Sequence, residues 1–396
     1  MPHYTCPYCF TKVNPSDIWY QCASTSCTEQ NEVWTRYRNN IEPTQPLPSG
    51  TVIIPHQTIF KGKSRERGIC PKPECCRHTS VRVCASCHNA FPSGIDGLSN
   101  DIIAIVGARG TGKSHYIAVL VQKLRQLGSK FHWTFSALND ETMKTYDEHF
   151  YRPLYLQRMT LKQTQTATFK GNEHVKAPMI YSLDIYGTKK TVILAFFDAA
   201  GEDLTSEDTM KQVNKYIANA SGIILLLDPT LIPDVNSEIQ KNYSLAKKAD
   251  DDDIIHHKNM LNRLSNFLRT QGGYDLTQSH TVHLAVTFSK IDFLRGVINE
   301  EEFELFARDI THDKNNLNLD ALESISDFIK PWLKSKGASD FVSDAQKFAS
   351  HQFFGMSALG TDPNSHQNKI PGGPKPMHVE DPFLWLLYAN GLMPGK

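Results

Sequence analysis

Apolar residues from position 102 onward recur in two alternating patterns. Between stretches of helical spacing, such as 114–127 and 254–271, the chain carries short, continuous apolar runs with the length of buried strands. The candidate strands cover 102–106, 179–185, 192–197, 223–227 and 282–288. Strands that alternate with helices predict an α/β fold, with a mainly parallel sheet covered by helices on both faces.

Two insertions interrupt this alternation. Residues 131–176 separate the first helix from the second long strand, and 139–155 within them has helical spacing. Residues 229–253 form the second insertion, which ends in two lysines, an alanine and four aspartates. We interpret that charged run as a solvated loop ahead of the helix at 254–271, in preference to a regulatory or metal-binding tail.

The first 97 residues have a different character from the rest. They are short of long apolar segments and rich in turn-forming residues, and the proline-rich stretch 43–50 divides them into two halves. All nine cysteines lie between Cys6 and Cys87. This segregation predicts two small cysteine-rich modules at 1–97, followed by a larger α/β domain at 98–396.

Charge and hydropathy narrow the class of protein. Lysine plus arginine equals aspartate plus glutamate, 42 against 42, so net charge gives no argument for nucleic acid or membrane partners. No apolar run approaches the length of a membrane span, and the N-terminus lacks the pattern of a secretion signal. We therefore expect a soluble cytoplasmic protein, where cysteines remain reduced and paired cysteines serve as metal ligands.

The cysteines form pairs with the spacing of zinc ligands. Four thiolates complete a tetrahedral Zn²⁺ site and leave no position for water, so two structural zinc centres are expected. Taken in chain order, the two sets are Cys6, Cys9, Cys22 and Cys27, then Cys70, Cys75, Cys84 and Cys87. A module of about 40 residues buries little surface, and zinc would supply much of its folding free energy.

Other arrangements of these cysteines stay open. In an interleaved grouping, Cys6 and Cys9 would join Cys84 and Cys87 in one site. Disulfides and free thiols fit the compartment and the spacing less well, and no electron-transfer feature supports an iron–sulfur cluster. Cys76 is either a spare thiol or a substitute for Cys75.

Residues 107–114 match the phosphate-loop pattern G-x-x-x-x-G-K-[ST] at every fixed position, between a predicted strand and a predicted helix. The glycines let successive backbone N–H groups point at phosphate oxygens, and the helix N-terminus adds partial positive charge. Lys113 is expected to reach the β and γ phosphates, and Ser114 to bind Mg²⁺. The candidate nucleotide-binding residues of this loop are Gly107, Arg109, Gly110, Thr111, Gly112, Lys113 and Ser114.

Three further motifs follow in order, each at the carboxyl end of a predicted strand. The first is D-x-x-G, where Asp198 would hold the magnesium through water and the Gly201 amide would sense the γ-phosphate. The second is Ser289-Lys290-Ile291-Asp292, and the third contains Ser357 and Ala358. Open α/β sheets bind ligands at this edge, so the four motifs are expected to share one site.

This ordered set resembles the GTPases of the translation-factor-related (TRAFAC) class, whose base-recognition motif is N/T-K-x-D. The resemblance implies that Asp292 accepts hydrogen bonds from guanine N1 and the exocyclic amine, which adenine does not offer as a pair. It also implies that the Lys290 stem covers the base and that the Ala358 amide binds guanine O6. Ser289 departs from the family's Asn or Thr, which predicts weaker or less stringent binding.

Hydrolysis is expected to be slow and to depend on a partner or a dimer. Glu202 stands where Ras-like proteins have a glutamine that orients the attacking water. Its carboxylate could also orient water, but it repels the phosphate charge. Arg109 could act as an internal arginine finger, although a position facing solvent or a partner is favoured. Four threonines could close over magnesium, and Thr166 is chosen among Thr160, Thr164, Thr166 and Thr168.

The pattern over residues 101–392 resembles bacterial double-GTPase families with an N-terminal zinc region, which are associated with conflict or signalling systems. It implies a GTP-dependent molecular switch whose zinc modules dock a protein partner or a second copy. Nucleic acid is the less favoured partner, because residues 1–97 hold only ten basic against seven acidic residues. The alternatives are a P-loop ATPase with a nucleic-acid-binding zinc ribbon and an interaction scaffold that nucleotide merely stabilises.

Overall fold

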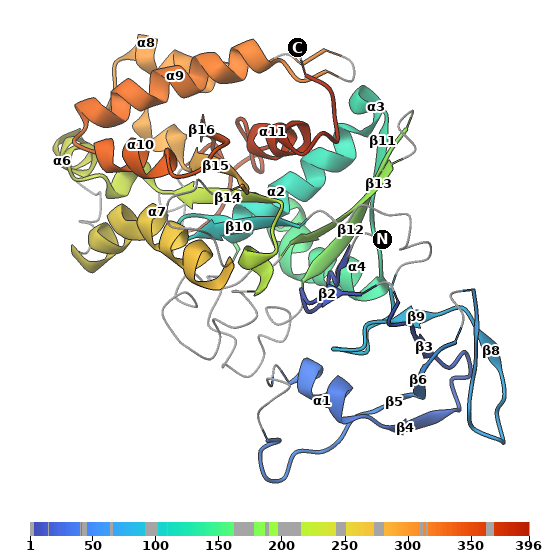
Figure 1. The fold of residues 1–396 in the computed structure, drawn as a ribbon. Helices are drawn as coiled ribbons and strands as arrows, with labels where there is room; N and C mark the ends of the chain where they lie inside the picture. The colour runs from blue at the N-terminus through green and yellow to red at the C-terminus, as the bar shows by residue number, and fades with distance from the viewer. Residues whose placement is uncertain are drawn as a thin grey trace. The chain divides into compact units, whose positions relative to one another are not determined.

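The computed structural model divides the chain into two compact units, residues 1–100 and 101–396, and each is described by itself (Figure 1). The structure describes residues 4–14, 16–39, 41, 46–63, 66–91, 102–108, 110–161, 178–186, 190–196, 215–242, 251–272, 281–308, 310, 312–313, 316–361 and 368–395. Among these residues, no helix is both long and apolar enough to cross a membrane.

The N-terminal unit interleaves its two halves. Strand β3 (Trp19–Gln21), from the first half, pairs antiparallel with β6 (Ile59–Lys61) on one side and β9 (Arg82–Val83) on the other. The expected pair of successive modules is therefore wrong, because strands of the second half flank one of the first. The other elements are β1 (Tyr4–Thr5), β2 (Lys12–Val13), β4 (Thr28–Gln30), α1 (Glu32–Arg38), β5 (Pro55–Gln57), β7 (Gly68–Ile69) and β8 (His78–Thr79).

A four-stranded parallel sheet lies at the centre of the larger unit, in the order β10-β14-β15-β16. The strands are β10 (Ile103–Gly107), β14 (Gly222–Leu227), β15 (His283–Phe288) and β16 (His351–Gly355). They end nearly level with one another, since Gly107 pairs with Leu226, Leu227 with Phe288, and Phe288 with Gly355. The loops that follow all four strands therefore emerge at one edge of the sheet.

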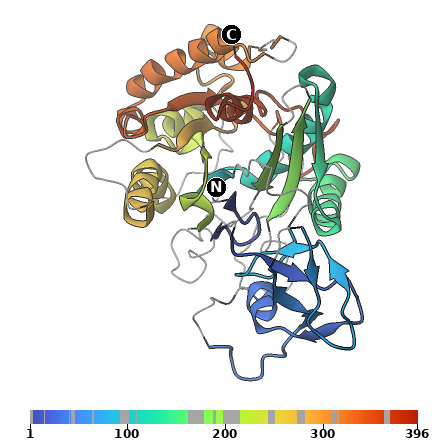
Figure 2. The same cartoon turned by 45° about the vertical axis from the view of Figure 1, so that its right-hand side comes forward.

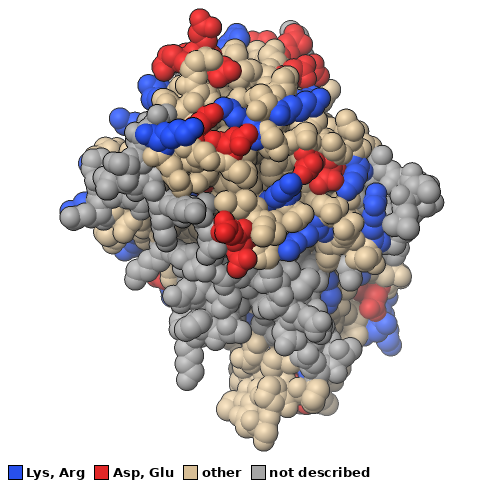
Figure 3. All heavy atoms as spheres, turned by 90° about the vertical axis from the view of Figure 1, so that its left-hand side faces the viewer, with Lys and Arg blue, Asp and Glu red and all other residues tan. Residues whose placement is uncertain are grey.

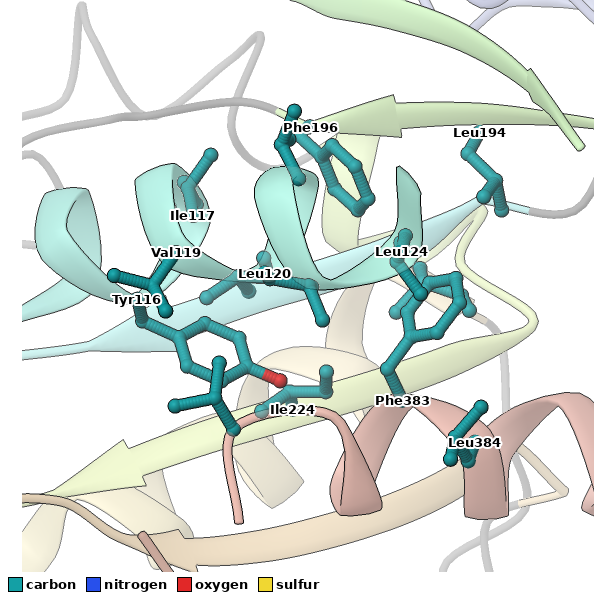
Figure 4. Packing of buried hydrophobic residues seen from close by; sticks show 14 of the residues in the cluster. Tyr116, Ile117, Val119, Leu120, Leu124, Leu194, Phe196, Ile224, Phe383 and Leu384 are labelled. Carbon is teal, nitrogen blue, oxygen red and sulfur yellow. The ribbon is translucent and has the colours of Figure 1, made fainter. Parts of the chain in front are cut away.

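Helices cover both faces of this sheet, as its continuously apolar strands predict. On one face, α2 (Lys113–Gln126) and α11 (Asp381–Ala389) pack with β14 and with β13 (Lys190–Phe196) in one cluster, shown in Figure 4. On the other face, Phe288 packs edge-on against Trp332 of α9 (Leu319–Ser335) and Phe341 of α10 (Ser339–Ala345). Phe341 also contacts His257 of α7 (Asp251–Gly272), so α7 belongs to this second layer.

The strands predicted at 179–185 and 192–197 are not part of the parallel ladder. They form β12 (Met179–Ile185) and β13 (Lys190–Phe196), an antiparallel pair that is joined by β11 (Trp133–Ala137) (Figure 2). Strand β11 lies where the sequence analysis placed an insertion with a helix alone. The expected helical segment there is α4 (Asp140–Tyr146), continued by the π-helical η2 (Asp147–Leu156).

A tyrosine hydroxyl occupies the edge of β10 that faces away from β14. Tyr216, from a short helical stretch at 215–218, donates to the Ile103 carbonyl at 2.8 Å and accepts from the Ile105 amide at 3.0 Å. These two backbone groups point away from β14, because the Ile102 carbonyl accepts from Ser221 on the β14 side. Strand β13 lies beside β10. Tyr216 thus fills hydrogen-bonding positions that a neighbouring strand would otherwise use.

The second predicted insertion is largely helical. It holds η5 (Pro229–Leu231) and α6 (Pro233–Asn242), and three of its aspartates, Asp251–Asp253, form the first turn of α7. The solvated-loop interpretation is wrong for these aspartates, whose negative charge complements the positive end of the helix dipole. The remaining elements are α3 (Gly128–Phe131), η6 (Ile291–Leu294) and α8 (Glu300–Ala307).

Candidate functional site

The phosphate loop follows β10 and opens α2, as its sequence requires. Gly110 and Gly112 adopt φ of +78° and +84°, in the left-handed region that favours glycine. Gly107 is held tightly, because an added Cβ would lie 2.6 Å from Thr111 Oγ1 and 3.0 Å from the Leu226 carbonyl oxygen. The buried Thr111 closes the loop by donating its hydroxyl to the Ala108 carbonyl at 2.9 Å. The conformation therefore depends on these residue types.

Helix α2 begins where this loop ends. Gly112 is its N-cap and accepts the first helical bond from Tyr116 at 2.8 Å, and no side chain caps the helix. Lys113 and Ser114 are its first two residues, so their backbone N–H groups lie at the positive end of the helix dipole. Added Cβ atoms at Gly110 and Gly112 would meet nothing within 4 Å among the described residues. The loop thus provides space and oriented donors for a phosphate chain.

The loops that follow β14 and β15 are joined by hydrogen bonds and an ion pair. At the end of β15, Ser289 donates both its amide, at 2.8 Å, and its hydroxyl, at 3.1 Å, to the Leu227 carbonyl of β14. The residues that follow Leu227 and Ser289 form an ion pair, in which the Lys290 ammonium lies 2.5 Å from the buried Asp228 carboxylate. Burial raises the pKa of Asp228, but the charge and hydrogen bond of Lys290 outweigh it and leave that pKa lowered. Asp228 is therefore a charged carboxylate that holds Lys290.

The last two motifs, whose residues are predicted to recognise the base, are brought together by one backbone bond. The Ile291 amide donates to the Met356 carbonyl at 3.2 Å. The Met356 amide in turn donates to the Phe288 carbonyl at 2.8 Å. This places Asp292, in the first turn of η6, next to the loop that carries Ser357 and Ala358. The Ser357 hydroxyl accepts from the Gly360 amide at 2.9 Å, which shapes that loop. The Asp292 Oδ1 atom is buried.

A histidine links the phosphate loop to the chain before the expected switch region. His115 follows Ser114, and its Nε2 accepts a hydrogen bond from the Leu161 amide at 3.0 Å. Burial, with a smaller effect from the positive charge of Lys290, lowers the pKa of His115 to about 4. The phosphate loop and Lys290 are 176 positions apart between Ser114 and Lys290, and the level ends of β10, β14 and β15 bring them to one edge of the sheet.

Five of the proposed site residues lie outside the described residues: Arg109, Thr166, Asp198, Gly201 and Glu202. Neither His115 nor Asp228 was predicted from the sequence as a site residue. Asp228 had one signal, its position directly after an apolar strand at the edge where ligands bind. His115 had no such signal, because a single histidine inside a predicted helix does not by itself indicate a site.

The cysteines form two tetrads, but not in chain order. Cys6, Cys9, Cys84 and Cys87 make one tetrad, and Cys22, Cys27, Cys70 and Cys75 make the other. The sets predicted in chain order, Cys6/Cys9/Cys22/Cys27 and Cys70/Cys75/Cys84/Cys87, are therefore wrong, and the interleaved grouping matches the structure. The physical reason is the pairing of β3 with β6 and β9, which brings the two halves of the unit together. All nine cysteines are free of disulfides.

Both tetrads fit zinc. Sulfurs about 2.3 Å from one zinc ion stand about 3.8 Å apart in a tetrahedron. The sulfurs of Cys6 and Cys87 are 3.8 Å apart, and those of Cys27 and Cys70 are also 3.8 Å apart. Nitrogen donors also point at the sulfurs, with Asn89 Nδ2 3.2 Å from Cys87 Sγ. Such outer donors are typical of metal-bound thiolates.

The pKa values of the thiols in the first tetrad are shifted in opposite directions. Burial raises the pKa of Cys6 and of Cys87, whereas hydrogen bonds from the neighbouring thiols lower the pKa of Cys9. Cys76 lies outside both tetrads, exposed and with φ of +45°. It is therefore the spare thiol and not a substitute for Cys75.

A glycine-rich loop between a strand and a helix, at the carboxyl edge of a parallel sheet, defines a P-loop nucleotide-binding protein. The model of the Double-GTPase 2 family matches residues 101–325, more than half of the chain. The chain therefore belongs to the double-GTPase 2 family.

Individual relatives are distant. A protein of Mycolicibacterium smegmatis named as a candidate ESX-1 scaffolding and assembly protein, SaeC, is 26% identical over 98% of this chain and 99% of its own length. Among solved structures, the GTP-bound GTPase-like domain of Ski7 from S. cerevisiae is 12% identical, over 75% of this chain and 52% of that one, with a TM-score of 0.33. The Arl6 small GTPase of Trypanosoma brucei is 13% identical, over 74% of this chain and 99% of that one, with a TM-score of 0.27.

The chain spans a small part of one matched structure, 29% of the bacterial selenocysteine-specific elongation factor, at 12% identity and a TM-score of 0.27. Scores this low do not establish a shared fold. The family assignment consequently depends on the match at 101–325.

Proposed function

We propose that this protein binds GTP with Mg²⁺ and hydrolyses it slowly, as a molecular switch in a bacterial signalling or conflict system. The observation that carries the proposal is the meeting of the phosphate and base motifs at one sheet edge. The loops after β10, β15 and β16 emerge there together, and Ile291 is bonded to Met356 between the two base motifs. Membership of the double-GTPase 2 family supports the choice of GTP.

Each end of the nucleotide would have its own set of residues. Lys113 would neutralise the β and γ phosphates, while Ser114 and Asp198 would hold the magnesium, which supplies charge neutralisation when bound. At the other end, Asp292 would accept two hydrogen bonds from guanine, and the Ala358 amide would donate to its O6. The apolar stem of Lys290 would cover the base.

For hydrolysis, we propose roles for residues after the first helix. Thr166 would close over magnesium, the Gly201 amide would sense the γ-phosphate, and Glu202 would orient the attacking water. A carboxylate beside the phosphates repels their charge, so turnover without a partner would be slow. Ordering and release of these segments would give a partner two surfaces to distinguish.

We further propose that two zinc ions hold the N-terminal unit for docking a protein partner. The close-packed sulfurs of its two tetrads support zinc, and thiolate ligands suit the reducing cytoplasm. A protein partner is favoured over nucleic acid, because the relative SaeC is named for scaffolding and assembly. On the described part of the face in Figure 3, basic and acidic side chains are interspersed and do not form a field of one sign.

That relative also supports a second candidate, an assembly scaffold in which nucleotide is held only for stability. Both candidates bind guanine nucleotide, and they differ in turnover. Multiple turnover of GTP that is lost with the phosphate-loop lysine would support the switch. Tight binding with no turnover, with or without a partner, would support the scaffold.

The test is nucleotide affinity and turnover of the full chain with magnesium, for wild type, Lys113→Ala and the control Lys144→Ala. Lys144 is an exposed lysine of α4 and should leave binding unchanged. Lys113→Ala should weaken GTP binding by on the order of a hundredfold, because it removes a charge-assisted contact. Equal or better affinity for ATP than for GTP would overturn the guanine assignment and favour the P-loop ATPase.

A further inference from the structure

The Lys290 side chain is held in one orientation by a carboxylate that follows the neighbouring strand β14. Its ammonium lies 2.5 Å from Asp228 Oδ2, and Asp228 is only 4% exposed. The Lys290 backbone adopts φ of 54° and ψ of 34°, the left-handed conformation that non-glycine residues rarely take. A backbone in this sparsely populated conformation persists where the surrounding structure holds it.

Asp228 is itself fixed by three contacts. Its Oδ1 accepts from the Thr230 amide at 3.0 Å and from the Thr230 hydroxyl at 2.6 Å. Its backbone amide donates to His257 Nε2 at 3.0 Å, and burial lowers the pKa of His257 to about 4, so this ring nitrogen is free to accept. One oxygen of the carboxylate is thus used by the turn, and the other is directed at Lys290.

The Asp228–Lys290 pair lies beside the position where the chain departs from the base-recognition pattern. Ser289 replaces the Asn or Thr of that pattern, and its hydroxyl is already bonded to the Leu227 carbonyl at 3.1 Å. It therefore ties the ends of β14 and β15 together. The next residue on each strand, Asp228 and Lys290, repeats the tie with opposite charges.

We propose that Asp228 is a positioning residue of the guanine pocket, which holds Lys290 so that its stem lies over the base. The proposal rests on the proposed function, since it assigns a role within the same pocket. Asp228 touches Lys290 and acts on the nucleotide through it. The carboxylate thus adds a second tie beside the one that the Ser289 hydroxyl makes to the Leu227 carbonyl.

The test compares two ligands, GTP and inorganic tripolyphosphate, on the full chain with magnesium. Asp228→Asn keeps an acceptor for Thr230 and removes the charge that holds Lys290. It should weaken GTP binding by on the order of tenfold, the size of one charge-assisted hydrogen bond, and leave tripolyphosphate binding unchanged. Asp234→Asn is the matched control, because it removes an exposed charge from the adjacent helix α6.

A second measurement separates positioning from general destabilisation. In a double-mutant cycle, Lys290→Met keeps an apolar stem of similar length, and adding Asp228→Asn to it should cause no further loss of GTP affinity. An equal loss for GTP and tripolyphosphate, or additive losses in the cycle, would overturn the proposal. A wild-type protein without guanine preference would instead overturn the proposed function, so the two failures are distinguishable.

Discussion

The sulfur of Cys9 lies 3.7 Å from the sulfur of Cys84, although 75 positions separate the two residues. The contact joins the first cysteine pair of the chain to the last. A zinc ion bound there would close a loop that contains the whole second tetrad. The N-terminal unit therefore cannot be cut between its halves without breaking both centres.

This arrangement predicts which thiols respond when one ligand is lost. Cys84→Ser in the full chain should reduce bound zinc from about two equivalents to about one. It should also expose Cys6 and Cys9 to a thiol reagent while Cys22 and Cys27 stay protected. Metal analysis and mass spectrometry of the modified protein provide the measurement. Cys76→Ser is the control and should keep both equivalents, whereas labelling of Cys22 in C84S would contradict the interleaved tetrads.

The guanine assignment predicts an exchange of base preference at Asp292. Asp292→Asn replaces an acceptor by an amide that can donate, which suits the additional carbonyl of xanthine. We expect GTP affinity to fall by on the order of a hundredfold and XTP affinity to rise, because two hydrogen bonds to a charged group are exchanged. Titration with both nucleotides measures the effect. Asp320→Asn, an exposed aspartate of α9, should change neither, and unchanged GTP binding by D292N would refute the pocket.

The phosphate loop was predictable because its chemistry is local in sequence. Successive N–H groups, one lysine and one hydroxyl must follow each other along the backbone, so the spacing of residues 107–114 carries the information. The parallel strands were predictable in part, since strands buried on both faces are continuously apolar. The family match at 101–325 agrees with that interpretation.

What the sequence did not predict depends on contacts between distant residues. The direction of β12 and β13 was missed, because an apolar run has the same period in parallel and antiparallel sheets. Strand β11 was missed because it has five residues, among which only Trp133 and Phe135 are buried. The cysteine tetrads and the Asp228–Lys290 pair depend on which strands become neighbours, and residue spacing along one chain does not contain that information.

The Tyr216 hydroxyl should stabilise the edge of β10 measurably. Tyr216→Phe keeps the buried ring and removes an oxygen that bonds to Ile103 and Ile105. Two backbone groups would lose their partner, at a cost of about 1–3 kcal/mol in the free energy of unfolding. Urea unfolding gives the value. Tyr388→Phe removes a hydroxyl from a more exposed tyrosine of α11 and serves as the control. Equal stability of Y216F and wild type would show that water replaces the lost bonds.

A buried carboxylate between two histidines predicts a stability that depends on pH. Asp381, at the start of α11, lies 2.8 Å from His378 Nδ1 and 3.2 Å from His312 Nε2. Burial raises the pKa of Asp381, but hydrogen bonds from both histidines outweigh it and bring that pKa to about 2. Burial likewise lowers the pKa of His378, but Asp381 outweighs it and leaves that pKa raised.

The pKa shifts of Asp381 and His378 stabilise the fold over pH ranges that overlap. A carboxyl with a depressed folded-state pKa stabilises the fold above its ordinary value of 3.8, and that contribution is lost as the pH falls toward 2. A histidine with a raised pKa stabilises the fold fully below its ordinary value of 6.5, and that contribution is lost as the pH rises through the folded-state pKa. The pair therefore contributes most between pH 3.8 and 6.5.

The variant His378→Asn tests this range, because asparagine tolerates the left-handed backbone of position 378, where φ is 53°. Relative to wild type, it should lose about 2 kcal/mol of unfolding free energy within the range, and less on either side of it. Urea unfolding across a pH series is the measurement. His256→Asn is the control, because the His256 ring is hydrogen-bonded to the exposed Arg263. A loss that is constant with pH would mean that His378 acts by packing and not by its charge.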